Sequence, residues 1–395
     1  MTLSHSISTP RIASIDIFRA ITMFFMIFVN DLWSITNVPH WLEHAAGNED
    51  MLGFSDIVFP SFLFILGMSI PLAIEKRLQK KDSKFEIIKH IVIRAIALLV
   101  MGLFTVNTES GVSPDTGMSR SVFILLMLLG FFLIWNVYPR TENKTAKYVY
   151  NGLKIAGVAV LLFLLIIFRD ASGEPFQKHW WGILGLIGWT YLLCAIIYLF
   201  LRRNWIYLML SCIAFVVLCI AGANGWLGGF SGIIPGDGCF HAFTMSGVLL
   251  TLLFNKPETE IPLRKKLLIA FGAGVAILLL GWLSHSWWII SKLQATPTWL
   301  FLCSGISILF YIFIYWLTDM QGKANWFNII KPAGTATLTC YLVPYLLYSI
   351  FTLTAFSLPA DILTSPMGLV KCVIFSFVTI GITALLGKAG VKLKI

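Results

Sequence analysis

Long apolar runs recur along this sequence, and they constrain its fold more than any other feature. A helix that crosses a bilayer needs about 20 mostly apolar residues. With 58% hydrophobic and 12% charged residues, the chain has the composition of a polytopic membrane protein. We therefore predict an all-α transmembrane bundle of about 11–12 helices in a single domain, 1–395. The expected helices lie near residues 15–35, 56–75, 87–106, 121–138, 150–168, 181–201, 205–222, 240–254, 266–284, 298–317, 334–356 and 367–387.

Positive charges indicate how this bundle is oriented. Cytoplasmic loops of membrane proteins carry an excess of Lys and Arg. Of the 29 Lys and Arg residues, 22 fall on the side of the N-terminus and five on the opposite side, while Arg19 and Arg94 lie within helices. We therefore expect both termini in the cytoplasm. The net charge of +10 follows from this topology, so we expect no nucleic-acid partner.

The stretch 11–71 places polar groups in its first two predicted helices. Asp16 and Arg19 open the first helix, Asn30 and Asp31 close it, and Asp56 starts the second. An unpaired charge near the centre of a membrane helix costs about 2.5–3.5 kcal/mol on insertion scales. We therefore expect these side chains to face a wet cavity, which is the candidate active site. Alternatively, Asp16 and Arg19 simply neutralise each other across one helical turn.

Two further residues of the second helix carry expectations of their own. Pro60 is predicted to lie in the first turn, where the missing N–H of proline is tolerated. Gly67 is predicted to let another helix approach closely.

Histidines and tryptophans gather in the loops expected outside the cell. Five of the seven histidines belong there: His40, His44, His179, His241 and His285. Because aromatic faces pack against sugar rings, this pattern predicts a polar, aromatic-lined external pocket, with an interfacial aromatic belt as the alternative. His40 and His44 are spaced to bind Zn²⁺ on a helix, but no third ligand is evident, so we expect no metal. The seven scattered cysteines are expected to pack inside helices.

A recognisable pattern covers the stretch 11–71. The residues that carry it are Arg11, Ser14, Asp16, Phe18, Arg19, Met26, Val29, Asn30, His44, Ala45, Asp56, Val58, Phe59, Pro60, Phe62, Phe64 and Gly67. This pattern resembles the start of the membrane domain in the heparan-α-glucosaminide N-acetyltransferase family, including bacterial relatives in which that domain stands alone. Arg94 and Asn107 match more weakly. The chain departs from the family pattern at Ala20 and in the loop after His44.

The resemblance implies an integral membrane acyltransferase in the bacterial inner membrane. It would move an acetyl group from cytoplasmic acetyl-CoA to an amino sugar, such as glucosamine or a glucosamine-ended glycan, on the periplasmic side. His44 matches the active-site histidine of the family and would act as general base or acetyl carrier. Asp56 and Asp16 would orient its imidazole. The expected donor and substrate contacts are Arg19, Asn30, Asp31, Arg94, Asn107, His285 and Lys292.

The sequence also leads to expectations about partners and about alternative functions. The expected partners are the lipid bilayer and the small-molecule amino sugar, with a possible homodimer. A secondary transporter for sugars or glycan fragments is the alternative function, although no internal repeat supports it. O-acylation of a surface glycan or lipid by the same residues is a third possibility.

Overall fold

The computed structural model describes residues 13–180, 182–257 and 259–395, and these are helical with no β-strand. Arg11, the first residue of the family pattern, lies outside the described residues. The longer helices are α1 (Ala13–Asp31), α2 (Phe54–Gln79), α3 (Lys84–Glu109), α4 (Arg120–Trp135), α5 (Lys144–Ile167), α6 (Ile183–Leu201), α7 (Trp205–Ala223), α8 (Cys239–Asn255), α9 (Leu263–Ser284), α10 (Pro297–Tyr315), α12 (Thr337–Leu353) and α13 (Met367–Lys388).

Each of the twelve helices expected from the apolar runs corresponds to one of these. In the described part of the chain, ten helices are long and apolar enough to cross a membrane, whereas α4 and α12 are shorter. The expected helix 334–356 is divided by a kink at Ala336, which separates the short helix α11 (Lys331–Thr335) from α12. The all-α multi-pass membrane fold is thus confirmed, and the cytoplasmic placement of the termini stays a prediction.

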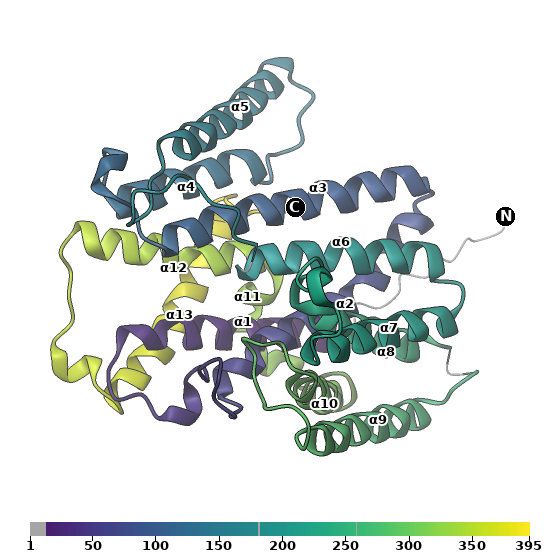
Figure 1. The fold of residues 1–395 in the computed structure, drawn as a ribbon. Helices are drawn as coiled ribbons and strands as arrows, with labels where there is room; N and C mark the ends of the chain where they lie inside the picture. The colour runs from purple at the N-terminus through teal and green to yellow at the C-terminus, as the bar shows by residue number, and fades with distance from the viewer. Residues whose placement is uncertain (1–12, 181, 258) are drawn as a thin grey trace.

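Helix α2 lies at the centre of the bundle, where it packs against α1, α6, α8 and α10 (Figure 1). Two glycines make its contact with α8 close. A Cβ on Gly67 would lie 1.8 Å from the carbonyl oxygen of Thr244, and one on Gly247 would lie 2.0 Å from that of Phe64. The expected role of Gly67 in close helix approach is therefore confirmed.

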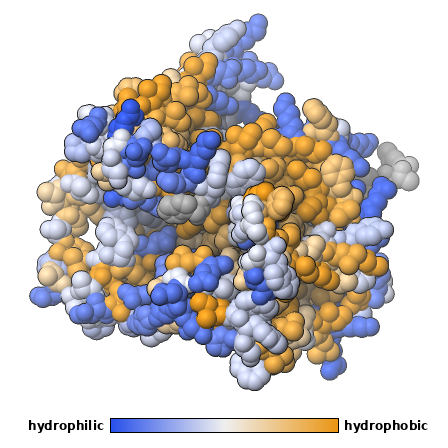
Figure 2. All heavy atoms as spheres, in the orientation of Figure 1, coloured by the Kyte–Doolittle hydropathy of each residue, from blue (hydrophilic) through white to orange (hydrophobic). Residues whose placement is uncertain are grey.

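The outer helices expose apolar side chains. The pairs α4–α5 and α9–α10 lie at opposite edges of the bundle in Figure 1. Trp282 on α9 is 70% exposed, as is Ile155 on α5. Figure 2 shows apolar residues covering a broad area over α3 and α6. This distribution fits a surface that faces lipid, where apolar side chains cost nothing.

Candidate active site

The loop between α1 and α2 brings His44 onto a buried carboxylate. The imidazole Nδ1 of His44 lies 2.7 Å from Oδ1 of Asp56, which stands in the first turn of α2. The Asp56 side chain is only 1% exposed, whereas that of His44 is 46% exposed. The structure thus pairs the expected base with one of its two expected orienting residues.

Two further hydrogen bonds hold Asp56 in place. Its Oδ2 accepts a hydrogen bond from the backbone N–H of Ala45 at 3.0 Å. Its backbone carbonyl accepts one from the indole Nε1 of buried Trp299 on α10, at 3.1 Å. The position just before α2 requires a glycine, because a Cβ on Gly53 would lie 2.0 Å from the carbonyl oxygen of Glu43. These contacts fix the carboxylate and, through it, the ring of His44.

Pro60 explains why the Asp56 carbonyl needs a partner outside its own helix. The helix begins at Phe54, so Pro60 lies beyond the first turn, and its expected position at the helix start was wrong. Because proline has no N–H, the carbonyl four residues earlier, that of Asp56, loses its helical hydrogen bond. Trp299 replaces that bond, as neighbouring helices can do in membrane proteins.

Lys292 completes the group from the loop between α9 and α10. Its Nζ lies 3.1 Å from His44 Nδ1 and 3.8 Å from Asp56 Oδ1. Burial lowers the pKa of the Lys292 ammonium, and the charge of Asp56 partly offsets this effect. One ring nitrogen cannot donate to Asp56 and accept from Lys292 at once. The shorter distance to the carboxylate favours a proton on Nδ1, which leaves a lone pair on Nε2.

A large cavity adjoins these side chains. Its volume is about 1070 Å³, and His44 and Lys292 both line it. Glu109, Trp180 and Asp237 contribute polar and aromatic atoms to its wall. The exposed part of His44 therefore faces a space large enough for a small-molecule ligand.

A second cavity, of about 370 Å³, contains Arg19 and Arg94 in its wall. Arg19 donates to Asp16 at 3.1 Å and to Ser69 on α2 at 2.6 Å. Arg94 lies over the ring of Tyr191, 4.7 Å from its centroid, and its buried Nε has no hydrogen-bond partner among the described residues. Ser69 lies thirteen positions after Asp56 on α2, so the Ser69 end of this cavity is about 20 Å further along the helix than Asp56.

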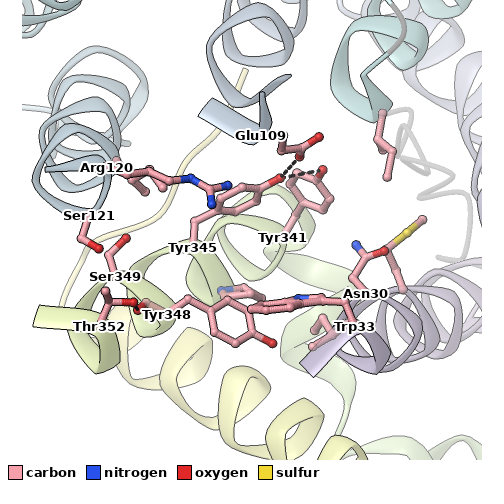
Figure 3. Close-up of a pocket in the computed structure, with 15 residues that line it drawn as sticks. Asn30, Trp33, Glu109, Arg120, Ser121, Tyr341, Tyr345, Tyr348, Ser349 and Thr352 are labelled. Atoms are coloured by element: carbon pink, nitrogen blue, oxygen red, sulfur yellow. Dashed lines mark hydrogen bonds between the residues drawn. The ribbon is translucent and has the colours of Figure 1, made fainter. Parts of the chain in front are cut away.

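A third cavity, of about 510 Å³, lies between α1, α3, α4 and α12. Figure 3 shows Asn30 and Trp33 on one side of it, across from Glu109 and Tyr345. Tyr345 donates to Oε1 of Glu109 at 2.9 Å and lies 3.5 Å from the hydroxyl of Tyr341. The three cavities adjoin one another, because Ile183 and Tyr341 line all of them.

The structure separates the other expected site residues from His44. Asp16 pairs with Arg19, in the second cavity, rather than with the imidazole. Asp31 is buried and bound by Lys371 on α13, at 2.8 Å from both carboxylate oxygens. Asn30 is exposed and faces the third cavity.

Two residues that were expected to contact the donor or the substrate hold loops in place instead. The Asn107 amide donates to the carbonyl of Gln177 at 3.0 Å and accepts from its N–H at 2.9 Å. His285 lies 2.7 Å from Asp50, which ties the α9–α10 loop to the loop that carries His44. These contacts engage both polar atoms of the Asn107 amide and Nε2 of His285 with the protein itself.

Sequence reasoning missed several residues of these cavities. Tyr341 and Glu109 stand in an apolar run and at a helix end, where no pattern distinguishes them. Lys371, which binds Asp31 outside these cavities, is one of the five Lys and Arg residues counted on the side opposite the N-terminus, and a lysine opposite an intramembrane aspartate is a signal for an ion pair. Within the described residues, no cluster of three or more His, Cys, Asp or Glu residues has the arrangement of a metal site.

The fold and these side chains define a class: a multi-pass helical membrane protein with a histidine–aspartate pair on a cavity wall. The comparison with protein families is more specific. The sequence profile described as "Domain of unknown function (DUF5009)" matches residues 11–226, and the chain belongs to this family.

Two curated relatives carry functional names. The chain is 37% identical over 106 residues to the heparan-alpha-glucosaminide N-acetyltransferase of Homo sapiens, a match that covers 27% of this chain and 15% of the human protein. It is 33% identical over 108 residues to the protein of the same name from Mus musculus, covering 27% and 16%. The chain thus aligns with about a sixth of the length of each relative.

Proposed function

We propose that this protein is a membrane acyltransferase that moves an acetyl group from acetyl-CoA to the amine of an amino sugar. The observation that carries the proposal is the buried Asp56 carboxylate, which leaves the lone pair of His44 Nε2 beside a ligand-sized cavity. The names of the two relatives support the same chemistry. The bacterial inner membrane and a homodimer stay predictions.

In the proposed reaction, the amine nitrogen attacks the thioester carbonyl carbon, and the carbon–sulfur bond breaks. His44 Nε2 takes the proton that the amine loses, and the CoA thiolate gains one from solvent. Asp56 holds the ring in the required tautomer and stabilises the imidazolium that forms. Lys292, which lines the cavity, places positive charge near the oxyanion that develops on the carbonyl oxygen.

The cavities suggest separate entrances for donor and acceptor. Arg19 and Arg94 suit the phosphates of CoA, since guanidinium groups bind phosphate strongly. The cavity at His44 and the aromatic third cavity suit a sugar. Because Ile183 and Tyr341 border all three, a thioester entering beside Arg19 reaches the cavity of His44 past these two side chains.

A turnover assay with matched histidine variants tests the proposal. Purified protein is given acetyl-CoA and glucosamine, and the product is identified by mass spectrometry, which also distinguishes N- from O-acetylation. His44→Ala is expected to lower turnover by about 10²–10⁴-fold, the usual contribution of a general base. His40→Ala is the control, because His40 in the same loop pairs with Glu49 at 2.6 Å.

Two results would contradict the proposal. Equal turnover in the wild type and His44→Ala would remove the assigned role of His44. Uptake of glucosamine into proteoliposomes without CoA, together with no acetylated product, would favour the transporter alternative. An acetyl group trapped on His44 in the absence of acceptor would instead support the acetyl-carrier route.

A further inference from the structure

The segment 391–395 is built into the wall of the second cavity. Lys392 accepts from the N–H of Val137 at 3.0 Å and donates its own N–H to Oδ1 of Asn136 at 2.8 Å. The next two N–H groups, of Leu393 and Lys394, donate to Thr339 and to the carbonyl of Trp135. Leu393 is 3% exposed, so its side chain anchors the segment in the core.

This anchoring places a third cation in that cavity. Lys394 and Ile395 line it together with Arg19 and Arg94. The charge of Arg19 is balanced by Asp16 at 3.1 Å. No carboxylate of the described side chains forms an ion pair with Arg94 or Lys394.

The balance of these side chains fits one chemical group. Arg94 and Lys394 carry two positive charges, and Arg94 also has a buried Nε without a hydrogen-bond partner among the described residues. A phosphate monoester carries a charge of about −1.5 to −2 at pH 7 and offers three acceptor oxygens. A phosphodiester carries only one charge, and the diphosphate of CoA spreads its two charges over two phosphates. The monoester concentrates its charge on a single group, so it is the better match for two cations that line one cavity.

We propose that Lys394, with Arg94, binds the 3′-phosphate of the CoA donor and thereby selects acetyl-CoA over its dephosphorylated form. This inference rests on the proposed function, because it assumes that the donor enters through this cavity. A phosphate monoester also occurs on phosphatidic acid. The nucleotide is the better fit, since the cavity continues to Ile183 and Tyr341, which also border the cavity of His44.

The test compares two donors in two lysine variants. The Michaelis constants for acetyl-CoA and for acetyl-dephospho-CoA are measured with the wild type, Lys394→Ala and Lys392→Ala. Lys394→Ala is expected to raise the KM for acetyl-CoA about tenfold, the loss of one charge-assisted contact, and to leave that for acetyl-dephospho-CoA unchanged. Lys394→Arg is expected to restore most of the difference. Lys392→Ala is the control, since Lys392 does not line the cavity.

The outcomes separate this inference from the proposed function. If Lys394→Ala still turns over but its KM changes equally for both donors, or for neither, the 3′-phosphate contact is overturned. Competition by vesicles that contain phosphatidic acid, but not by adenosine 3′,5′-bisphosphate, would overturn the nucleotide assignment. No turnover and no nucleotide binding by the wild type would instead refute the proposed function itself.

Discussion

Two buried aspartates near one end of the bundle have different surroundings. Asp31 at the end of α1 and Asp56 at the start of α2 are each 1% exposed, and each has a lysine nearby. Asp31 is saturated by Lys371, Ser34 and the hydroxyl of Tyr348. Asp56 instead contacts an imidazole that reaches a cavity. Their partners, rather than their burial, therefore distinguish the structural carboxylate of Asp31 from the carboxylate of Asp56, for which we propose a role in catalysis.

The largest effect is expected from Asp56→Asn. The amide keeps the size of the side chain, but its NH₂ group favours the tautomer with the lone pair on Nδ1, which removes the base from Nε2. Acetyl transfer should fall by about 10²–10⁴-fold with little change in thermal stability. Asp31→Asn is the matched variant, and an equal loss of turnover there would contradict the distinction between the two aspartates.

The next largest effect is expected from removing Lys371, the cation that binds Asp31. Lys371→Met leaves the Asp31 charge buried without its cation, which is expected to destabilise the protein by about 3–5 kcal/mol. Thermal unfolding in detergent measures this loss. The double variant with Asp31→Asn should recover most of it, and a double variant as unstable as the single one would argue against the ion pair as the cause.

A smaller effect is expected at the carbonyl of Asp56. Trp299→Phe removes the indole N–H and leaves that carbonyl with only the weak thiol donor of Cys303 at 3.9 Å, at a cost of about 1–3 kcal/mol in stability. Pro60→Ala restores a backbone N–H to α2 and should reduce the cost of the tryptophan change. Additive losses in the double variant would show that Trp299 acts through packing alone.

The smallest effect concerns the exposed pair His40–Glu49 in the same loop as His44. The hydrogen bond to Glu49 raises the pKa of His40, and the N–H of Ala46 lowers the pKa of Glu49. The stability that His40 contributes is fully present below its ordinary pKa of 6.5. It is lost as the pH rises through the raised pKa that His40 has in the folded protein. The stability that Glu49 contributes is fully present above its ordinary pKa of 4.5. It is lost as the pH falls through the lowered pKa that Glu49 has in the folded protein.

Protection of the loop amides against hydrogen exchange should therefore be greatest between pH 4.5 and 6.5, where both residues contribute fully. Hydrogen exchange at the N–H of Ala46 measures this protection, and His40→Gln is expected to remove its alkaline decline. A decline that persists in that variant would assign the pH dependence to a group other than His40.

The sequence was sufficient to predict the helices because lipid tolerates few polar residues in a spanning segment. It also indicated His44 and Asp56, because both match the family pattern and only twelve positions separate them in the chain. It could not show that Asp16 lies far from His44, because the depth of a residue depends on where a helix begins and how it packs. Nor could it identify Lys371 as the partner of Asp31 or Tyr345 as the partner of Glu109, since these contacts join residues 340 and 236 positions apart.

The meeting of the cavities at Ile183 and Tyr341 has an electrical consequence. A bilayer core is about 30 Å thick, and a voltage across it normally falls over that whole distance. Where water enters from both ends, the field concentrates across the material that remains between them. If the donor and acceptor cavities open to opposite faces of the membrane, as proposed, that material includes Ile183 and Tyr341, which line both cavities. A charge that passes them would therefore sense most of the membrane potential, about 2.3 kcal/mol per 100 mV, within a few ångströms.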